Sequence, residues 1–205
     1  MGRRWLLVAM GLRALMVGML VRVLQAGPLD HRFAGKGIGS RALIVVPATS
    51  LALPLLWAVA GRSRRAYPHA ADALLLSITA LDLAGNLLDL YDRHRHFDLI
   101  PHAHGTGALT IEIAWLLGLP MQRAFAIATV GHALLEAQEI ASDALFGYRN
   151  IRGWWDTAGD LVAGVGGGAV YGALYLRLVR QAGREPPSPF GAPEVAASSR
   201  PSRRR

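Results

Sequence analysis

The chain of 205 residues contains no cysteine, and charged residues make up only 18% of it. The absence of cysteine excludes disulfide bonds, thiolate catalysis and zinc sites built from cysteine. Hydrophobic residues account for 52% of the chain, and several windows of about 20 residues are nearly free of charge. Such windows are long enough to cross the ~30 Å hydrocarbon core of a bilayer, whereas helices of soluble proteins are shorter and have a polar face. The sequence therefore predicts an integral membrane protein.

A nucleic-acid partner is not expected, although the formal net charge is +8. The arginines lie in short connections and near the C-terminus, and no basic segment is interleaved with aromatic residues. The glycine-rich segment at residues 35–40 lacks the spacing of a phosphate-binding loop. The positive charge is better explained as a topology signal, with membrane lipids as the surroundings of the protein.

Six hydrophobic segments predict an all-α fold, a polytopic bundle of six transmembrane helices. They cover residues 5–24, 42–60, 71–91, about 101–118, 121–144 and 156–179. The first is interpreted as a retained span and not a cleaved signal peptide, because Arg13 and Arg22 interrupt it and no cleavage site follows. Residues 1–180 are expected to form the bundle, and residues 181–205 a disordered, basic, cytoplasmic tail.

The distribution of Lys and Arg predicts the orientation in the plasma (inner) membrane. If both termini are cytoplasmic, more of these residues lie on the inner side than on the outer side, although much of the excess comes from the tail. We therefore expect both termini inside.

The last hydrophobic segment begins with two acids that share a helical face. Asp156 and Asp160 are four residues apart, and further steps of four lead to Gly164, Gly168 and Gly172. Small residues at this spacing allow a neighbouring helix to approach closely within a bilayer. We expect these glycines to be packing residues and the acids to point into the bundle, because an acid facing lipid is costly.

The expected topology brings ionisable residues of several segments to one membrane face. The residues that gather there include Asp98, His102, Glu136, Glu139, Asp156 and Asp160. One histidine with several carboxylates suits a divalent cation such as magnesium, calcium or manganese, and the imidazole adds zinc or iron. Acid–base chemistry, a proton relay, or a structural network paired with Arg13, Arg149 and Arg152 are the alternatives.

Other polar residues are interpreted separately. Asp82, Asn86 and Asp89 share one face of the third segment, and Glu112 lies deep in the fourth. His94, His96 and His104 are expected to be hydrated loop residues. Trp154 and Trp155 are typical of an aromatic belt at the membrane interface.

The chain resembles the YjdF-like family of bacterial inner-membrane proteins over roughly residues 70–178. The resemblance rests on Phe97-Asp98 with His102 and Gly105, on Glu136-Ala137-Gln138-Glu139, and on Trp155-Asp156-Thr157 with Asp160. More loosely the chain resembles the VanZ-like membrane proteins associated with glycopeptide resistance, but Gly164 stands about where those proteins often have Asn. The resemblance implies a bundle with several spans and marks positions, and it supplies no reaction.

Three functions are compatible with this pattern. The first is a membrane-embedded enzyme or metal-binding protein acting on a lipid-linked or envelope substrate at the outer face. The second is a small ion- or proton-coupled transporter, which would be favoured by an internal repeat, and the sequence shows none. The third is a structural or assembly protein.

Overall fold

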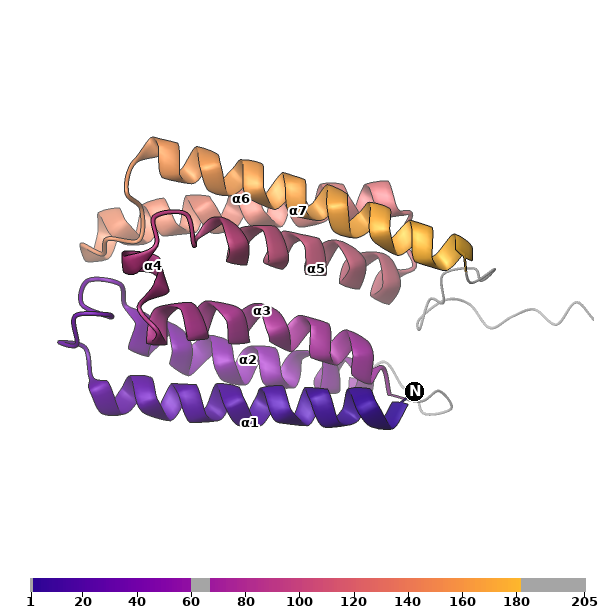
Figure 1. Cartoon of the computed structure of the whole chain (residues 1–205), viewed down its shortest axis with the longest axis horizontal. Coiled ribbons are helices and arrows are strands. Elements are labelled where there is room, and N and C mark those ends of the chain that lie inside the picture. Colours follow the sequence, from indigo (N-terminus) through magenta and orange to yellow (C-terminus); the bar gives the residue numbers. More distant parts are fainter. Residues whose placement is uncertain (1, 60–66, 182–205) are drawn as a thin grey trace, which may run out of the picture.

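A computed structural model describes residues 2–59 and 67–181, and every regular element in these ranges is a helix. The six long helices are separated by short connections, and a short helix α4 precedes α5 (Figure 1). The elements are α1 (Gly2–Ala26), α2 (Ile38–Val59), α3 (His69–Leu87), α4 (Leu90–Arg93), α5 (Leu99–Leu117), α6 (Met121–Phe146) and α7 (Trp154–Gln181). The tail expected at 181–205 lies outside the described residues from 182 onward.

Four of the helices, α1, α2, α3 and α7, are long and apolar enough to cross a membrane. Their outward faces carry large apolar side chains, including Leu7 (66% exposed), Val59 (85%) and Val162 (73%). Soluble proteins rarely expose contiguous apolar surface on this scale. The helical architecture and these faces support the expected membrane protein.

Local sequence explains where the helices of the C-terminal half begin and end. Gly118 and Gly147 follow α5 and α6 with φ of 63° and 68°, a left-handed conformation that glycine adopts without steric cost. Pro120 immediately precedes α6, where its missing amide hydrogen is not needed. Residues 118–120 therefore form a tight turn between α5 and α6.

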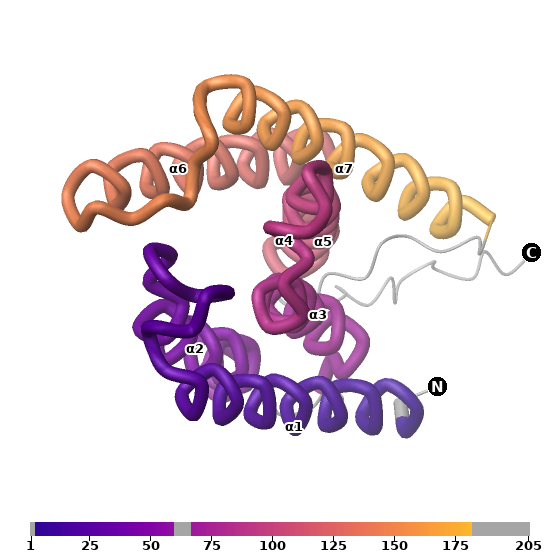
Figure 2. Tube along the Cα trace, turned by 60° about the vertical axis from the view of Figure 1, so that its left-hand side comes forward, coloured from indigo at the N-terminus to yellow at the C-terminus, as the bar shows by residue number. Residues whose placement is uncertain are grey.

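The long helices form two groups that meet through α3 and α5. In the first group α1 packs on α3 and α2, around a core that includes Met16, Val46 and Leu76. In the second group α5 packs on α7 and α6. Among the described residues, α2 and α6 nowhere bring Cα atoms within 8 Å of each other, and Figure 2 shows their backbones apart. The side chains of Arg41 and Glu139 meet between them at 3.5 Å.

The glycines of α7 lie at its contact with α5 and α6. Gly164, Gly167, Gly168 and Gly172 are all buried. A Cβ atom at Gly167 would collide with the backbone of Ala103, and one at Gly168 would lie 2.7 Å from the Phe125 ring. The expected small-residue face is present. Gly167, which the steps of four did not include, marks a close approach of the α5 and α7 backbones.

Candidate functional site

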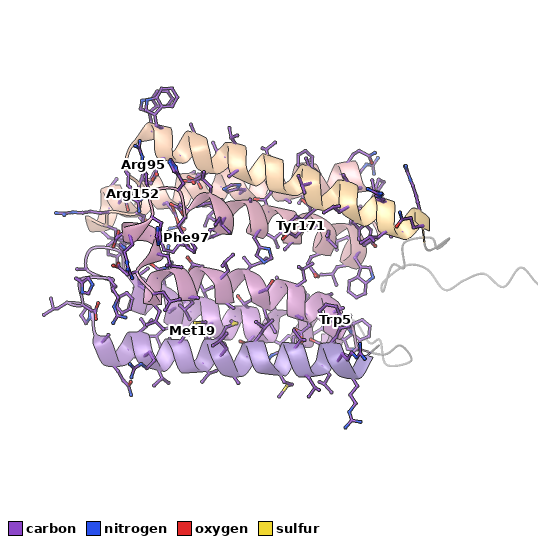
Figure 3. The ribbon with its side chains drawn as sticks, viewed as in Figure 1. Trp5, Met19, Arg95, Phe97, Arg152 and Tyr171 are labelled. Atoms are coloured by element: carbon purple, nitrogen blue, oxygen red, sulfur yellow. The ribbon has the colours of Figure 1, made fainter. Side chains whose placement is uncertain are left out.

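Polar side chains from α5, α6 and α7 converge near one end of the bundle. His102 lies in the first turn of α5, His132 and Glu136 lie in α6, and Asp160 lies near the start of α7. This is the end at which Phe97 and Arg152 are labelled in Figure 3, opposite to Trp5. His132, Glu136 and Asp160 are buried among the helices.

The centre of this cluster is a pair of histidines facing one carboxylate. The distance between His102 Nδ1 and His132 Nε2 is 2.8 Å, and Glu136 Oε1 lies 3.3 Å from each of these two nitrogens. The two rings are stacked, with centroids 4.9 Å apart. Two nitrogens and one oxygen therefore lie within 3.3 Å of one another.

The opposite nitrogen of each ring also has a polar neighbour. His102 Nε2 lies 3.3 Å from Asp98 Oδ1 and 4.0 Å from Asp160 Oδ1. The hydroxyl of Thr106 lies 3.0 Å from His132 Nδ1. Asp98 immediately precedes α5 without capping it, so its carboxylate is free to contact the histidine one turn later. These contacts fix the orientation of both rings through the nitrogen that does not face Glu136.

This arrangement suits two kinds of chemistry. Two imidazole nitrogens with one carboxylate form a three-residue ligand set of the type that binds zinc in catalytic sites, and the same donors accept iron or manganese. Asp98, Asp160, His102 and His132 lie close enough to hold and pass protons along a polar chain. The ligand atoms of His102, His132 and Glu136 lie within 4.8 Å of one another, and so do those of Asp98, His102 and Asp160.

The structure separates the sequence candidates into two sets. Asp98, His102, Glu136 and Asp160 come together as described. Glu139 instead lies 3.5 Å from the guanidinium of Arg41 in α2, and Asp156 accepts a 3.0 Å hydrogen bond from the backbone amide of Arg152. These last two carboxylates contact neither histidine within ion-pair distance among the described residues.

His132 and Thr106 belong to the cluster, although neither was among the six candidate site residues. His132 stands one helical turn before Glu136, so its presence on the same face was visible in the spacing. His104, expected in a hydrated loop, lies within α5, where that expectation was wrong. Its ring nitrogens are 2.9 Å from the Ser77 hydroxyl and 2.8 Å from the Tyr171 hydroxyl.

A cavity of about 470 Å³ lies beside the cluster. His102 and His132 line it from α5 and α6, and Arg41 and Asp82 line it from α2 and α3. Pockets of this size hold small organic ligands. The histidine pair is therefore next to a space large enough for a small organic molecule.

A second polar group lines the cavity on the side of α3. The Tyr91 hydroxyl donates a 2.8 Å hydrogen bond to the Asp82 carboxylate. The same carboxylate accepts a 3.2 Å hydrogen bond from the side-chain amide of Asn86. Burial, together with the Asp82 carboxylate, raises the pKa of the Tyr91 phenol far above its ordinary value. Tyr91 consequently remains a hydrogen-bond donor at physiological pH.

Comparison of the chain with protein-family models, with curated proteins and with solved structures gave no match.

Proposed function

We propose that the protein is a six-span integral membrane protein with a divalent-metal centre formed by His102, His132 and Glu136. The centre serves acid–base chemistry on a lipid-linked substrate held in the adjoining cavity. The observation that carries this proposal is the orientation of the histidines. Their facing nitrogens share one carboxylate, while their opposite nitrogens contact Asp98 and Thr106.

The geometry is close to what a metal ion requires. Zinc–nitrogen bonds are about 2.0–2.1 Å, so two imidazole nitrogens on a tetrahedral ion are roughly 3.3 Å apart. The nitrogens of His102 and His132 are 2.8 Å apart, at hydrogen-bond distance, so an ion would replace this hydrogen bond and the nitrogens would move apart by about 0.5 Å. Metal-bound histidines usually contact a carboxylate or another oxygen through the other nitrogen, as both rings do here.

A metal at this position would act as a Lewis acid and activate a bound water or substrate oxygen. Asp98 orients His102, and Asp160 adds a carboxylate 4.0 Å from the same ring. The low exposure of Glu136 and His132, 3% and 6%, limits the access of bulk water to the ligands. The chain's own residues thus hold, orient and shield the reacting atoms.

Metal analysis tests this proposal directly. We expect protein purified without a metal-affinity tag to contain about one zinc, iron or manganese ion per chain, measured by plasma mass spectrometry. A chelator should lower the thermal midpoint and added metal should restore it, because an ion that binds only the folded state stabilises it. His132→Ala and Glu136→Gln should lose the ion.

Glu139→Gln is the matched control, because Glu139 lies on the same helix but contacts Arg41. It should keep the full metal content. Wild-type protein that contains no stoichiometric metal, and whose thermal midpoint does not change with zinc, iron(II), manganese, magnesium or calcium, would refute the metal centre.

The proposed topology has α5 and α6 as spans beside the four more apolar helices, with both termini cytoplasmic and the cluster toward the outer face. The distribution of Lys and Arg supports this orientation, and the resemblance to YjdF-like proteins supports a bundle with several spans. Because the chain lacks cysteine, single cysteines introduced at His96 and Ser198 report without background. We expect an impermeant maleimide to label position 96 in intact cells and position 198 only after lysis. The reverse pattern would invert the topology.

Proton-coupled transport is a second candidate, favoured by polar side chains that continue deeper into the bundle. His104 contacts Ser77 and Tyr171, and beyond it Glu112 is 3% exposed with one carboxylate oxygen lacking a hydrogen-bond partner among the described residues. Intramembrane acids of this kind often belong to proton pathways. Metal-free protein that dissipates a pH gradient in proteoliposomes would favour transport over the metal centre.

A further inference from the structure

We infer that the gap between α2 and α6 is a lateral entrance through which an amphiphile with a phosphate head group reaches the cavity from the bilayer. This inference rests on the proposed function, because the same cavity contains His102 and His132, and it specifies the class of substrate. The bound molecule would place its phosphate against cationic residues at the loop end and its alkyl chain between the two helices.

The gap has apolar walls contributed by both helices. Val45 of α2 and Leu135 of α6 line the cavity, and they are 37% and 45% exposed. No Cα atoms of the described α2 and α6 residues approach within 8 Å. In a bilayer, an apolar opening between two spans faces lipid chains, and an alkyl chain can occupy it without leaving an apolar environment.

Two loops meet over the end of the cavity. The amide of Arg149 donates a 2.7 Å hydrogen bond to the carbonyl of Gly35. The Tyr148 ring packs on Gly37 so closely that a Cβ there would lie 2.6 Å from it. These contacts join the α1–α2 connection to the α6–α7 connection and cover the end of the cavity. Between α2 and α6 the Arg41 and Glu139 side chains meet at 3.5 Å, so the proposed entrance lies beside this ion pair.

The charges along the cavity are segregated. Near the loops it is lined by Lys36, Arg149 and Arg152, with Asp92 as the acid beside them. The carboxylates of Asp82, Asp98 and Glu139 also line it, together with Arg41, which lies 3.9 Å from Asp82 and 3.5 Å from Glu139. An anionic head group is therefore attracted to the loop end and repelled by the interior, which leaves a divalent cation favoured at the histidine pair.

Arg149 is the cation best placed to bind the phosphate. Its side chain lines the cavity and is exposed, and in the described ranges no carboxylate lies within ion-pair distance of its guanidinium. Lys36 already forms an ion pair with Asp92 at 2.6 Å, and Arg152 donates a 2.6 Å hydrogen bond to the Tyr91 carbonyl. A guanidinium with free donors binds phosphate oxygens in pairs.

Dodecyl phosphate is a suitable probe, used with protein in dodecyl maltoside micelles. We expect it to raise the thermal midpoint of the wild type saturably, because it binds the folded bundle. Inorganic phosphate at the same concentration should produce no shift, since it lacks the alkyl chain. An equal shift with inorganic phosphate would identify a free-anion site and overturn the lipid assignment.

Two variants locate the probe. Arg149→Gln should weaken dodecyl phosphate binding at least tenfold, and Arg149→Lys should retain part of the affinity. The matched control is Arg95→Gln, which removes the same charge at the same end of the bundle from a residue outside the cavity lining (Figure 3). Equal losses in Arg149→Gln and Arg95→Gln would reduce the binding to non-specific attraction and overturn the inference.

Gly131→Leu tests the entrance itself. Gly131 lines the cavity, and a Cβ there would meet no atom within 4 Å, so the leucine should fill the cavity without disturbing the fold. We expect loss of dodecyl phosphate binding. Gly18→Leu, at an equally open site on α1, should bind as the wild type does. Undiminished binding by Gly131→Leu would overturn the inference.

The same preparations separate this inference from the metal centre. Dodecyl phosphate binding is measured with chelated and with metal-loaded protein, beside the metal content. Metal without probe binding removes the lateral entrance and leaves the metal centre. Probe binding that depends on Arg149 and Gly131 in protein that takes up no metal removes the metal centre and supports the lipid site.

Discussion

Replacing Arg13 with methionine is expected to lower the free energy of unfolding by about 3–5 kcal/mol. The guanidinium of Arg13 makes hydrogen bonds of 2.7 and 2.8 Å to the two carboxylate oxygens of Asp72, which is 1% exposed. It also donates to the Ser50 carbonyl, so one side chain joins α1, α2 and α3. Methionine would leave a buried carboxylate without its counter-charge.

Equilibrium unfolding in mixed micelles with increasing SDS measures this effect. The double variant Arg13→Met/Asp72→Leu should recover most of the loss, because replacing both members of a buried ion pair by apolar residues is often neutral. Arg22→Met is the control, since Arg22 is exposed on the same helix. If Arg13→Met and Arg22→Met unfold at the same SDS concentration, the ion pair does not hold the first helix group together.

The helices were the most predictable part of the structure. Each expected span coincides with a helix, with differences of a few residues at the ends, because apolar runs set helix length and glycine or proline marks the ends. The division into two groups was not predicted. It depends on which apolar faces fit together, as α5 fits the glycines of α7, and single-helix patterns do not encode that choice.

The candidate site was predictable where its members share one helix. Asp98 and His102 are one turn apart, as are His132 and Glu136, and both pairs are in contact. Glu139 follows Glu136 by three residues, a rotation of about 60° around the helix axis, and this turns it toward Arg41. Spacing along α6 placed His132 beside Glu136 but did not reveal that His102 of α5 faces it.

The position of Asp156 along the helix axis is a second feature that helical spacing alone did not predict. It lies one turn before Asp160, about 6 Å farther toward the loops, where α7 begins. There its carboxylate accepts the backbone amide of Arg152. Asp156 and Asp160 share one helical face, but their different positions along the axis give them different partners.

Gly167→Ala is expected to lower the free energy of unfolding by about 1–3 kcal/mol, although alanine is the better helix former. The added methyl group would collide with the carbonyl of Ala103. A backbone group cannot move aside by changing rotamer, so α5 and α7 would have to separate. Gly166→Ala is the matched control, because its methyl group would meet no atom within 4 Å, and it should be neutral or slightly stabilising.

The same substitution should also weaken the proposed metal centre. Gly164, one turn before Gly167 and Gly168, lies against the His132 ring, and α5 carries His102. Separation of α5 and α7 would therefore loosen both histidines, and we expect Gly167→Ala to retain less metal than Gly166→Ala after identical dialysis. Parallel measurement of unfolding and metal content distinguishes the two effects. Equal stability of the two variants would contradict the close approach of the helices, and reduced stability with unchanged metal content would show that the histidine pair does not depend on it.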